Sequence, residues 1–330
     1  MVGARAIEPP GLVGVDWGST SLRVFLIGVD GRLLDSRASD AGCSAMDGDP
    51  AAYRAALARH AGDWLDADPD LPLLVCGMAG SKHGWHEVPY ADCPADLAQL
   101  PLHRLPRPAY DSARFAAIVP GLLHAPAAAP PDVMRGEEVQ LAGALVGHPA
   151  LASDSVIVLP GTHSKWARIV DGRAMAFATH MTGELYALLS RQSVLARLMP
   201  VDADGHDEAG FLAGVRAARD AGPGESLSHQ LFAVRTLGLT QRLAPSALAD
   251  YLSGLLIGHE LRAGLAWRDT AGCASGPLAL VGEPSLCRRY AQALAAFDAP
   301  LHASLANTVP AGLWSLARRA GLLQPSRESV

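Results

Sequence analysis

The stretch that decides the fold is LVGVDWGSTSLRVFLIGVDGRLL, residues 12–34. Two aliphatic and β-branched runs, residues 12–16 and 22–29, flank a short polar loop, and Asp30-Gly31 follows the second run. An Asp-Gly pair between apolar runs is a strong signal for a tight hairpin turn. The pattern therefore predicts a strand, a polar loop, a second strand, a turn, and a third strand at residues 32–34.

The same order returns later in the chain. Its parts are a strand at 155–159, a polar loop at 160–165, a strand at 166–170, an Asp171-Gly172 turn and a strand at 173–177. A repeat this long predicts two similar domains, not a solenoid, and 330 residues suffice for about two domains. We place the boundary near residues 150–154 and expect domains at residues 1–150 and 151–330.

Helical and strand patterns alternate through the rest of the chain. Apolar periodicity predicts helices at residues 51–65, 136–146, 183–198, 246–267, 285–296 and 311–320, and buried strands at 71–76 and 278–281. Residues 100–131 are rich in proline and are expected to be irregular. Strands that alternate with helices predict an α/β fold with mixed sheets covered by helices.

Composition excludes several classes of protein. The formal net charge is −6 and no block of Lys and Arg occurs, so nucleic acid is not an expected partner. No apolar run approaches the roughly 20 residues of a membrane span, and the first ten residues lack the apolar core of a secretory signal. Five scattered cysteines without a CxxC pair indicate reduced thiols. We expect a cytoplasmic protein without a membrane partner; a homodimer is left open.

The polar loop of the first unit carries candidate phosphate ligands. Gly18, Ser19 and Thr20 are small residues with backbone N–H groups and hydroxyls that suit a phosphate. Asp16 ends a buried strand, where a carboxylate holds a divalent cation through water, and Arg23 adds positive charge from the next strand. The alternative is an ordinary polar hairpin.

The polar loop of the second unit is the matching candidate. Its phosphate ligands would be Gly161, Thr162, His163, Ser164 and Lys165. Lys82 and Lys165 are the two lysines among 27 basic residues, so each invites the question of why arginine does not stand there. A requirement for a compact ammonium group is one answer, and chance survival is the other.

Two further motifs have both a structural and a functional interpretation. Glu137 and Glu138 open a predicted helix, where acids complement the helix dipole; one of them could instead be a general base. A purine could lie between the Gly282-Glu283 pair that follows a strand and a helix face cleared by two glycines, Gly254 and Gly258. Close helix packing is the alternative for those two glycines.

In combination these motifs resemble the 2-dehydro-3-deoxygalactonokinase family of the actin/hexokinase/heat-shock-protein-70 ATPase superfamily. The resemblance covers about residues 12–320 and is carried by Val15–Arg23, Cys76–Ser81, Asp132–Gln140, Leu159–Trp166, Thr182–Leu185 and Leu252–Glu260. It implies two ribonuclease-H-like (actin-like ATPase) domains with a nucleotide cleft between them. One departure is Pro160, which stands where the superfamily often has an acidic residue, so the second loop is not expected to ligate Mg²⁺.

The resemblance implies ATP-dependent phosphorylation of the 6-hydroxyl of 2-dehydro-3-deoxy-D-galactonate, in galactonate breakdown. It assigns Asp16 to Mg²⁺ and the two polar loops to the phosphates of ATP, with Glu138 preferred over Glu137 as general base. The substrate side would comprise Ser81, Lys82, His83, Trp85, Arg135, Thr182 and Glu184. Two other functions stay open: a phosphatase acting on polyphosphate or a nucleotide, and a nucleotide-dependent sensor without catalysis. The residues do not choose between the galactonate and gluconate epimers.

Overall fold

A computed structural model describes residues 9–106, 114–200, 206–273 and 276–323. The chain divides into two compact units. The first unit comprises residues 1–153, 169–176 and 307–330, and the second comprises 154–168 and 177–306. The first unit is therefore discontinuous, since it includes a hairpin turn and a terminal segment that follow the expected boundary. Within the described ranges, no helix is long and apolar enough to cross a membrane.

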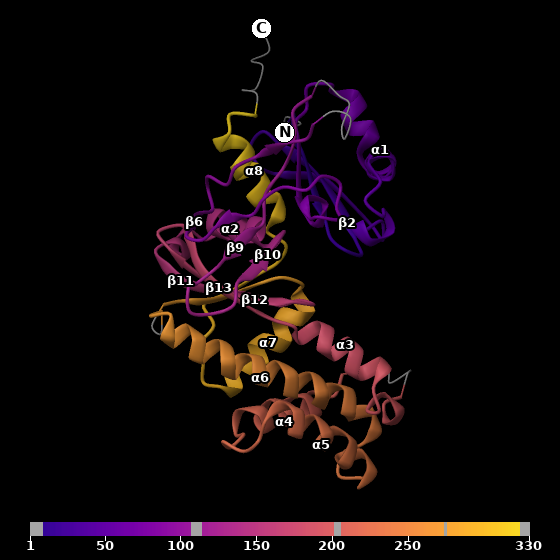
Figure 1. The fold of residues 1–330 in the computed structure, drawn as a ribbon, viewed down its shortest axis with the longest axis vertical. Helices are drawn as coiled ribbons and strands as arrows, with labels where there is room; N and C mark the ends of the chain where they lie inside the picture. Colours follow the sequence, from indigo (N-terminus) through magenta and orange to yellow (C-terminus); the bar gives the residue numbers. More distant parts are fainter. Residues whose placement is uncertain (1–8, 107–113, 201–205, 274–275, 324–330) are drawn as a thin grey trace, which may run out of the picture. The chain divides into compact units, whose positions relative to one another are not determined.

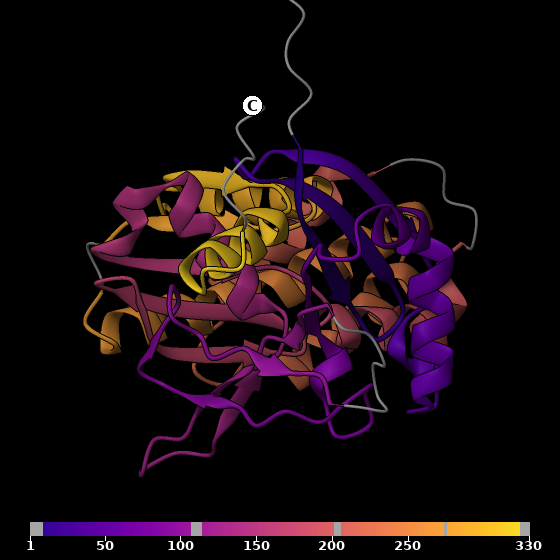
Figure 2. The same cartoon turned by 90° about the horizontal axis from the view of Figure 1, so that it is seen from above.

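The first unit is built on a six-stranded sheet, which carries the hairpin strands expected from residues 12–34 (Figure 1). Its strands, in spatial order, are β3 (Leu33–Ser39), β2 (Leu22–Gly28), β1 (Pro10–Trp17), β4 (Leu73–Gly77), β8 (Ala116–Ile118) and β7 (His103–Arg104). The first three are antiparallel, and β4 runs parallel to β1. Helix α1 (Pro50–Ala67), capped by Asp49, runs alongside these strands (Figure 2).

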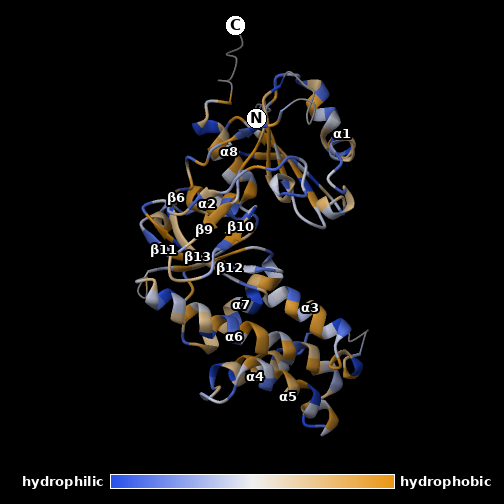
Figure 3. Ribbon diagram, in the orientation of Figure 1, coloured by the Kyte–Doolittle hydropathy of each residue, from blue (hydrophilic) through white to orange (hydrophobic). Residues whose placement is uncertain are grey.

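The core under this sheet is aromatic. Trp17 of β1 contacts Tyr53 of α1 edge-on at 4.8 Å, and Tyr53 stacks on Trp85 at 5.7 Å. All three side chains are buried. Figure 3 shows that β2 and the neighbouring strands consist largely of hydrophobic residues. Burial of these rings fixes the strand end at Trp17, from which the first polar loop starts.

The remainder of the first unit holds short elements. A small sheet contains β10 (Asp132–Met134), β9 (Leu122–His124) and β5 (Ala91–Asp92), so part of the segment expected to be irregular forms strands. The helices are η1 (Cys43–Ala45), η2 (Met78–Gly80), α2 (Glu137–Gly147), η3 (Pro149–Ala152) and α8 (Val309–Arg319). Helix α8 packs on α2 and on β1.

A second sheet carries the repeat of the hairpin, whose turn lies in residues 169–176 of the first unit. Its strands, in spatial order, are β15 (Ala303–Leu305), β14 (Leu278–Val281), β11 (Asp154–Leu159), β12 (Ser164–Val170) and β13 (Arg173–His180). Asp171 and Gly172 have φ of 48° and 73°, as the predicted tight turn requires. The start of β13, at Arg173 and Ala174, belongs to the first unit and pairs there with β6 (Ala95–Asp96).

Helices dominate the rest of the second unit. They are α3 (Thr182–Gln192), η4 (Ala196–Leu198), α4 (Glu208–Arg219), α5 (Leu227–Leu239), η5 (Pro245–Ala247), α6 (Leu248–Thr270) and α7 (Pro284–Ala296). The long helix α6 packs against α3, α4, α5 and α7 (Figure 1). Helices α4 and α5 were absent from the sequence prediction. All five cysteines are free thiols.

Candidate active site

Three acidic side chains gather in the first unit where β1 ends and α2 begins. Asp16 lies opposite Cys76 of β4, and the next residue of β4 is Gly77. Gly77 and Gly136 both have positive φ, 84° and 106°, and a Cβ on Gly136 would lie 3.3 Å from the Gly77 Cα. Glycine at both positions lets the start of α2 approach the strand ends, which brings Glu137 into electrostatic contact with Asp16.

The charge state of Asp16 reflects its surroundings. Burial raises the pKa of Asp16 to about 6, the positive charge of Arg23 opposes the rise, and Glu137 adds to it. The Arg23 guanidinium lies 3.7 Å from the Asp16 carboxylate, and the Arg23 side chain is 49% exposed. A single long ion pair leaves coordination capacity on this carboxylate.

Glu138 is enclosed in the first unit, with an exposed fraction of 0%. Its Oε2 accepts a hydrogen bond of 2.6 Å from the Gly136 N–H, and its buried Oε1 has no partner in the described part of the chain. Burial, followed by the charge of Glu137, raises the pKa of Glu138 well above its usual range. An enclosed carboxyl offers a substrate no access, so this geometry does not support the preference for Glu138.

Glu137 is the more accessible of the two acids. Its side chain is half-buried, and its Oε2 accepts a 3.0 Å hydrogen bond from the Arg135 N–H. Glu137 stands in the first turn of α2. The chemistry expected of this helix start therefore fits Glu137.

The acidic residues at this strand end fit a Mg²⁺ ion that takes most of its ligands from water and from substrate phosphates. The described residues contain no group of three or more His, Cys, Asp or Glu side chains able to hold a metal. Mg²⁺ keeps several waters in most sites and takes one or two carboxylates together with substrate phosphates. Asp16, with spare carboxylate capacity at a strand end, meets that requirement.

A pocket of about 400 Å³ lies beside the first polar loop. Its lining residues are Ser19, Cys43, Ser44, Asp47, Gly48, Met78, Ser81, Lys82, His83 and Gly84. The segment at 42–44 is tied to the loop, since the Cys43 and Ser44 N–H groups donate to the carbonyls of Gly18 and Ser19. The hydroxyls of three serines and the side chains of Lys82 and His83 offer partners for a polar anion, whereas Asp47 adds one negative charge to the lining.

Four residues expected at the sites line this pocket, and two substrate candidates of the first unit do not. Ser19, Ser81, Lys82 and His83 line it. Trp85 is 3% exposed and belongs to the aromatic core, so it is not a pocket wall. Arg135 stacks on Tyr90 at 4.3 Å and donates to the Val88 carbonyl at 3.0 Å, outside the pocket lining. The sequence did not predict that residues 43–48 contribute to the pocket lining, because only the folding of the chain brings them to the first polar loop.

A second pocket, of about 460 Å³, lies wholly in the second unit. It is lined by Pro160, Gly161, Thr162, Thr182, Gly183, Tyr186, Ser253, Leu256, Ile257, Glu283, Leu286, Arg289 and Tyr290. Aromatic and aliphatic side chains from α3, α6 and α7 form its apolar walls, and Gly161 and Thr162 of the polar loop also line it. A pocket of this size with apolar walls and few polar groups is typical of a small-molecule site.

The loop and the start of α3 are fastened together. The Glu184 N–H donates to the Thr162 carbonyl at 3.0 Å, and His163 contacts the Glu184 carboxylate. A Cβ on Gly183 would lie 2.4 Å from the Gly161 carbonyl oxygen. Thr182 and Gly183 therefore form an edge of the second-unit pocket, not of the pocket beside Lys82.

Two polar side chains of the second loop point inward. The Ser164 hydroxyl is buried and donates at 2.7 Å to Glu260, so its single hydrogen is not available to a phosphate. Lys165 is 4% exposed, and its Nζ donates to the His163 carbonyl at 2.9 Å. Of this loop, Gly161 and Thr162 line the second-unit pocket, and Ser164 and Lys165 do not.

Gly254 and Gly258 face α4 and not the pocket. A Cβ on Gly254 would lie 2.0 Å from the Phe211 carbonyl oxygen, and one on Gly258 would lie 2.7 Å from the Ala218 Cβ. Their expected place beside a purine is corrected: they permit close packing of two helices. The pocket face of α6 is the one that carries Ser253, Leu256 and Ile257. Gly282 lies next to the pocket residue Glu283, which caps α7.

Gly254→Ala is expected to destabilise the protein by about 1–3 kcal/mol, because the added methyl group forces α4 and α6 apart. Gly62→Ala is the matched control, since Gly62 lies inside α1 and its nearest neighbour would be the Ala58 Cβ at 4.0 Å. Alanine there should stabilise the helix by up to about 1 kcal/mol. Urea unfolding of both variants measures the difference. Equal effects would contradict the packing role of Gly254.

Comparison with known proteins gives these pockets a context. The profile of the 2-keto-3-deoxy-galactonokinase family matches residues 16–316. A Rhizobium meliloti (strain 1021) protein assigned provisionally as the 2-dehydro-3-deoxygalactonokinase DgoK1 is 36% identical over 306 residues, or 92% of this chain and 95% of the relative. The 2-dehydro-3-deoxygalactonokinase of Escherichia coli (strain K12) is 34% identical over 312 residues, or 92% and 97%.

Solved structures agree with the sequence matches. A Sinorhizobium meliloti protein assigned provisionally as a 2-dehydro-3-deoxygalactonokinase is 33% identical, with a TM-score of 0.79 over 94% of this chain and 98% of that one. Component A of the Acidaminococcus fermentans (R)-2-hydroxyglutaryl-CoA dehydratase is 9% identical, with a TM-score of 0.50 over 95% and 99%. At that identity the second likeness concerns the fold alone.

The α/β fold, with mixed sheets covered by helices, confirms the fold class predicted from the sequence. Within that class, the chain belongs to the 2-keto-3-deoxy-galactonokinase family, and it is a sugar-acid kinase.

Proposed function

We propose that the enzyme transfers the γ-phosphate of Mg²⁺-bound ATP to the 6-hydroxyl of 2-dehydro-3-deoxy-D-galactonate. The names of the curated relatives support the sugar acid. The observation that carries the nucleotide is the 460 Å³ pocket of the second unit, whose lining combines apolar side chains with Gly161 and Thr162 of the polar loop. The proposal places the enzyme in the cytoplasm, with ATP as the phosphate donor.

The second-unit pocket suits a nucleoside whose phosphates extend toward the loop. Leu256, Leu286 and Tyr290 offer apolar contact area for a base. Arg289 is fixed at the wall, because its Nη1 donates to the Asp250 carboxylate at 2.7 Å and its guanidinium stacks on Phe211 at 4.4 Å. Backbone N–H groups of the loop are the donors that a phosphate needs.

The first-unit pocket suits the sugar acid. The Lys82 ammonium is the proposed partner of the substrate carboxylate, and the hydroxyls of Ser44 and Ser81 are hydrogen-bonding partners for the sugar hydroxyls. Asp16 would hold Mg²⁺, which supplies charge neutralisation to the phosphates when bound. Glu137 would accept the proton of the attacking hydroxyl, because it is accessible and Glu138 is enclosed.

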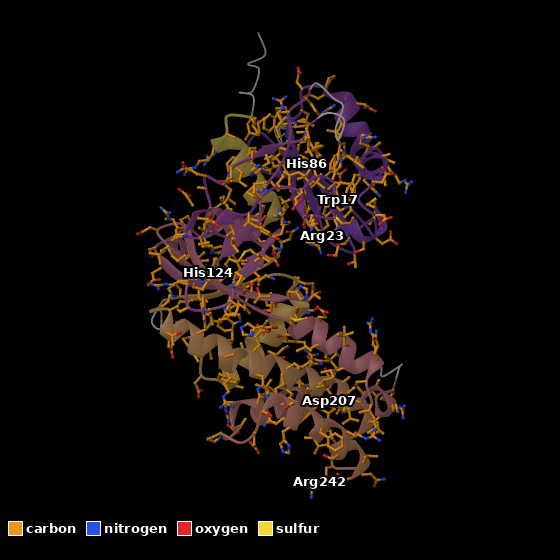
Figure 4. The ribbon with its side chains drawn as sticks, viewed as in Figure 1. Trp17, Arg23, His86, His124, Asp207 and Arg242 are labelled. Carbon is orange, nitrogen blue, oxygen red and sulfur yellow. The ribbon has the colours of Figure 1, made fainter. Side chains whose placement is uncertain are left out.

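Lys82→Met is expected to raise KM for the sugar acid by roughly tenfold or more, since the loss of a charge-assisted contact costs about 1.5–3 kcal/mol. KM for ATP should stay within about twofold. Arg242→Met is the control, because Arg242 is exposed at the end of α5 in the second unit (Figure 4). Coupled steady-state kinetics give both constants. An unchanged KM for the sugar acid in Lys82→Met would move the carboxylate site elsewhere.

A coupled ADP-release assay tests the proposed reaction. It is run with Mg²⁺-ATP and 2-dehydro-3-deoxy-D-galactonate, beside the gluconate epimer and a blank without sugar acid. Turnover on the galactonate compound alone supports the kinase and its stereospecificity. Turnover on both compounds means a permissive pocket. Steady ATP hydrolysis in the blank, with no gain on addition, favours a phosphatase. Saturable ATP binding without turnover favours a sensor.

A further inference from the structure

Glu260 lies at the centre of a buried hydrogen-bond cluster to which none of the roles above assigns a function. It is 3% exposed, on helix α6. Its Oε1 accepts from the Ser164 hydroxyl at 2.7 Å and the Trp166 indole N–H at 2.9 Å. Its Oε2 accepts from the Tyr290 hydroxyl at 2.7 Å and from the Thr182 hydroxyl. One carboxylate thus joins β12, α3 and α7 to α6.

The donors of this cluster are the supports of the second-unit pocket. Thr182 and Tyr290 line the pocket, and Ser164 follows the phosphate loop directly. Trp166 is held from the other side, since a Cβ on Gly264 would lie 2.3 Å from its ring. Loss of the carboxylate would free both the loop and the start of α3 from α6.

The cluster also fixes the direction of two hydroxyl hydrogens. Ser and Thr hydroxyls each have one hydrogen to donate, and those of Ser164 and Thr182 are directed at Glu260. Glutamine at 260 cannot reproduce this pattern. The Trp166 N–H can only donate, so the amide oxygen would face Trp166, and the amide NH₂ would face the Thr182 and Tyr290 hydroxyls. Those hydroxyls would then have to turn their hydrogens away.

We propose that Glu260 is a positioning residue of the nucleotide site, which acts through Ser164 and Thr182 to hold the Gly161–Thr162 loop and the start of α3 against the phosphates of ATP. This inference rests on the proposed ATP site. It predicts that Glu260 affects nucleotide affinity and leaves sugar-acid affinity unchanged. A purely structural role would lower stability without that selectivity.

The test compares Glu260→Gln and Thr182→Val with wild type by calorimetric titration of Mg²⁺-ATP and by steady-state kinetics. Both variants should bind ATP roughly tenfold more weakly, with KM for the sugar acid within about twofold of wild type. Thr182→Ser keeps the hydroxyl and should restore affinity. Thr182→Val removes a single hydroxyl with little change of volume, so it keeps the test valid if Glu260→Gln folds poorly.

Arg268→Lys is the control for general damage to α6. Arg268 is 7% exposed on the same helix and donates to the carbonyls of Cys273 and Gly276, outside the pocket lining. The Arg268→Lys substitution should lower the unfolding midpoint without a change in ATP affinity. If the Glu260→Gln and Thr182→Val proteins bind ATP like wild type, the inference about Glu260 is overturned and the proposed function is not. A wild-type protein that does not bind ATP would overturn both the inference and the proposed function.

Discussion

Asp16→Asn is expected to lower turnover by roughly 10²–10³-fold or more, which places it among the largest effects of any single substitution here. Phosphoryl transfer depends on positioning and charge neutralisation, and the amide has neither the charge nor the second oxygen acceptor that Asp16 offers to Mg²⁺. The fold should survive, because Asn has nearly the same shape. The coupled assay at saturating substrates measures the loss, and a Mg²⁺ titration should show a raised half-saturation concentration. Turnover close to wild type would remove Asp16 from the proposed metal site.

The same substitution should stabilise the metal-free protein at neutral pH. The folded-state pKa of Asp16 is raised to about 6 from a reference of 3.8, so its charged form is disfavoured by folding. The favourable contribution of Asp16 to the free energy of unfolding is fully present below about pH 4. It is lost as the pH rises through about 6. Asn does not titrate. In urea unfolding, Asp16→Asn should therefore raise the free energy of unfolding above that of wild type by more at about pH 7.5 than at about pH 5. A variant less stable than wild type at both pH values would contradict the burial argument.

Glu137→Gln is expected to lower turnover by about 10²–10⁴-fold, the range typical of a general base, with ATP affinity little changed. The expectation rests on access: Glu137 is half-buried near Asp16, whereas Glu138 is enclosed. A single-turnover measurement separates the chemical step from product release.

Glu138→Gln is the informative comparison with Glu137→Gln. Glu138 is enclosed and away from the reacting groups, and the glutamine oxygen can still accept from the Gly136 N–H. Turnover should stay within about tenfold of wild type. A large loss in Glu138→Gln with little loss in Glu137→Gln would reverse the assignment and show that the carboxyl at 138 becomes accessible during the reaction.

Hairpins were predictable from local sequence, whereas helix pairs were not. Both Asp-Gly turns lie where the alternation of apolar runs placed them, because a tight turn depends on a few adjacent residues. Helices α4 and α5 were missed. Gly210 and Gly214 lower the local helix propensity of α4, yet a Cβ on Gly214 would lie 2.1 Å from the Tyr251 carbonyl oxygen of α6. Tertiary packing stabilises that helix, and local sequence does not report it.

The sequence predicted the loop residues of the candidate site better than it predicted which other residues line the pockets. Residues such as Ser19, Lys82 and Thr162 stand in polar segments at strand ends, and each lines a pocket. Trp85 could not be placed, since only the folded chain brings it onto Tyr53. Glu260 had a local signal that was overlooked: it follows Leu256 and Ile257 at helical spacing, and an acid on a buried helix face requires several donors.

The discontinuity of the first unit has a consequence for the order in which the protein can fold on the ribosome. Helix α8 supplies part of that unit: the Trp314 indole donates to the Val29 carbonyl at 3.1 Å, and the Thr308 hydroxyl donates to the Gln140 carbonyl at 2.7 Å. The strands synthesised first must therefore wait for a helix synthesised more than a hundred residues after α2. During elongation, the faces of β1 and α2 that α8 covers remain open to water and to chaperones, while every segment of the second unit has already left the peptidyl transferase centre.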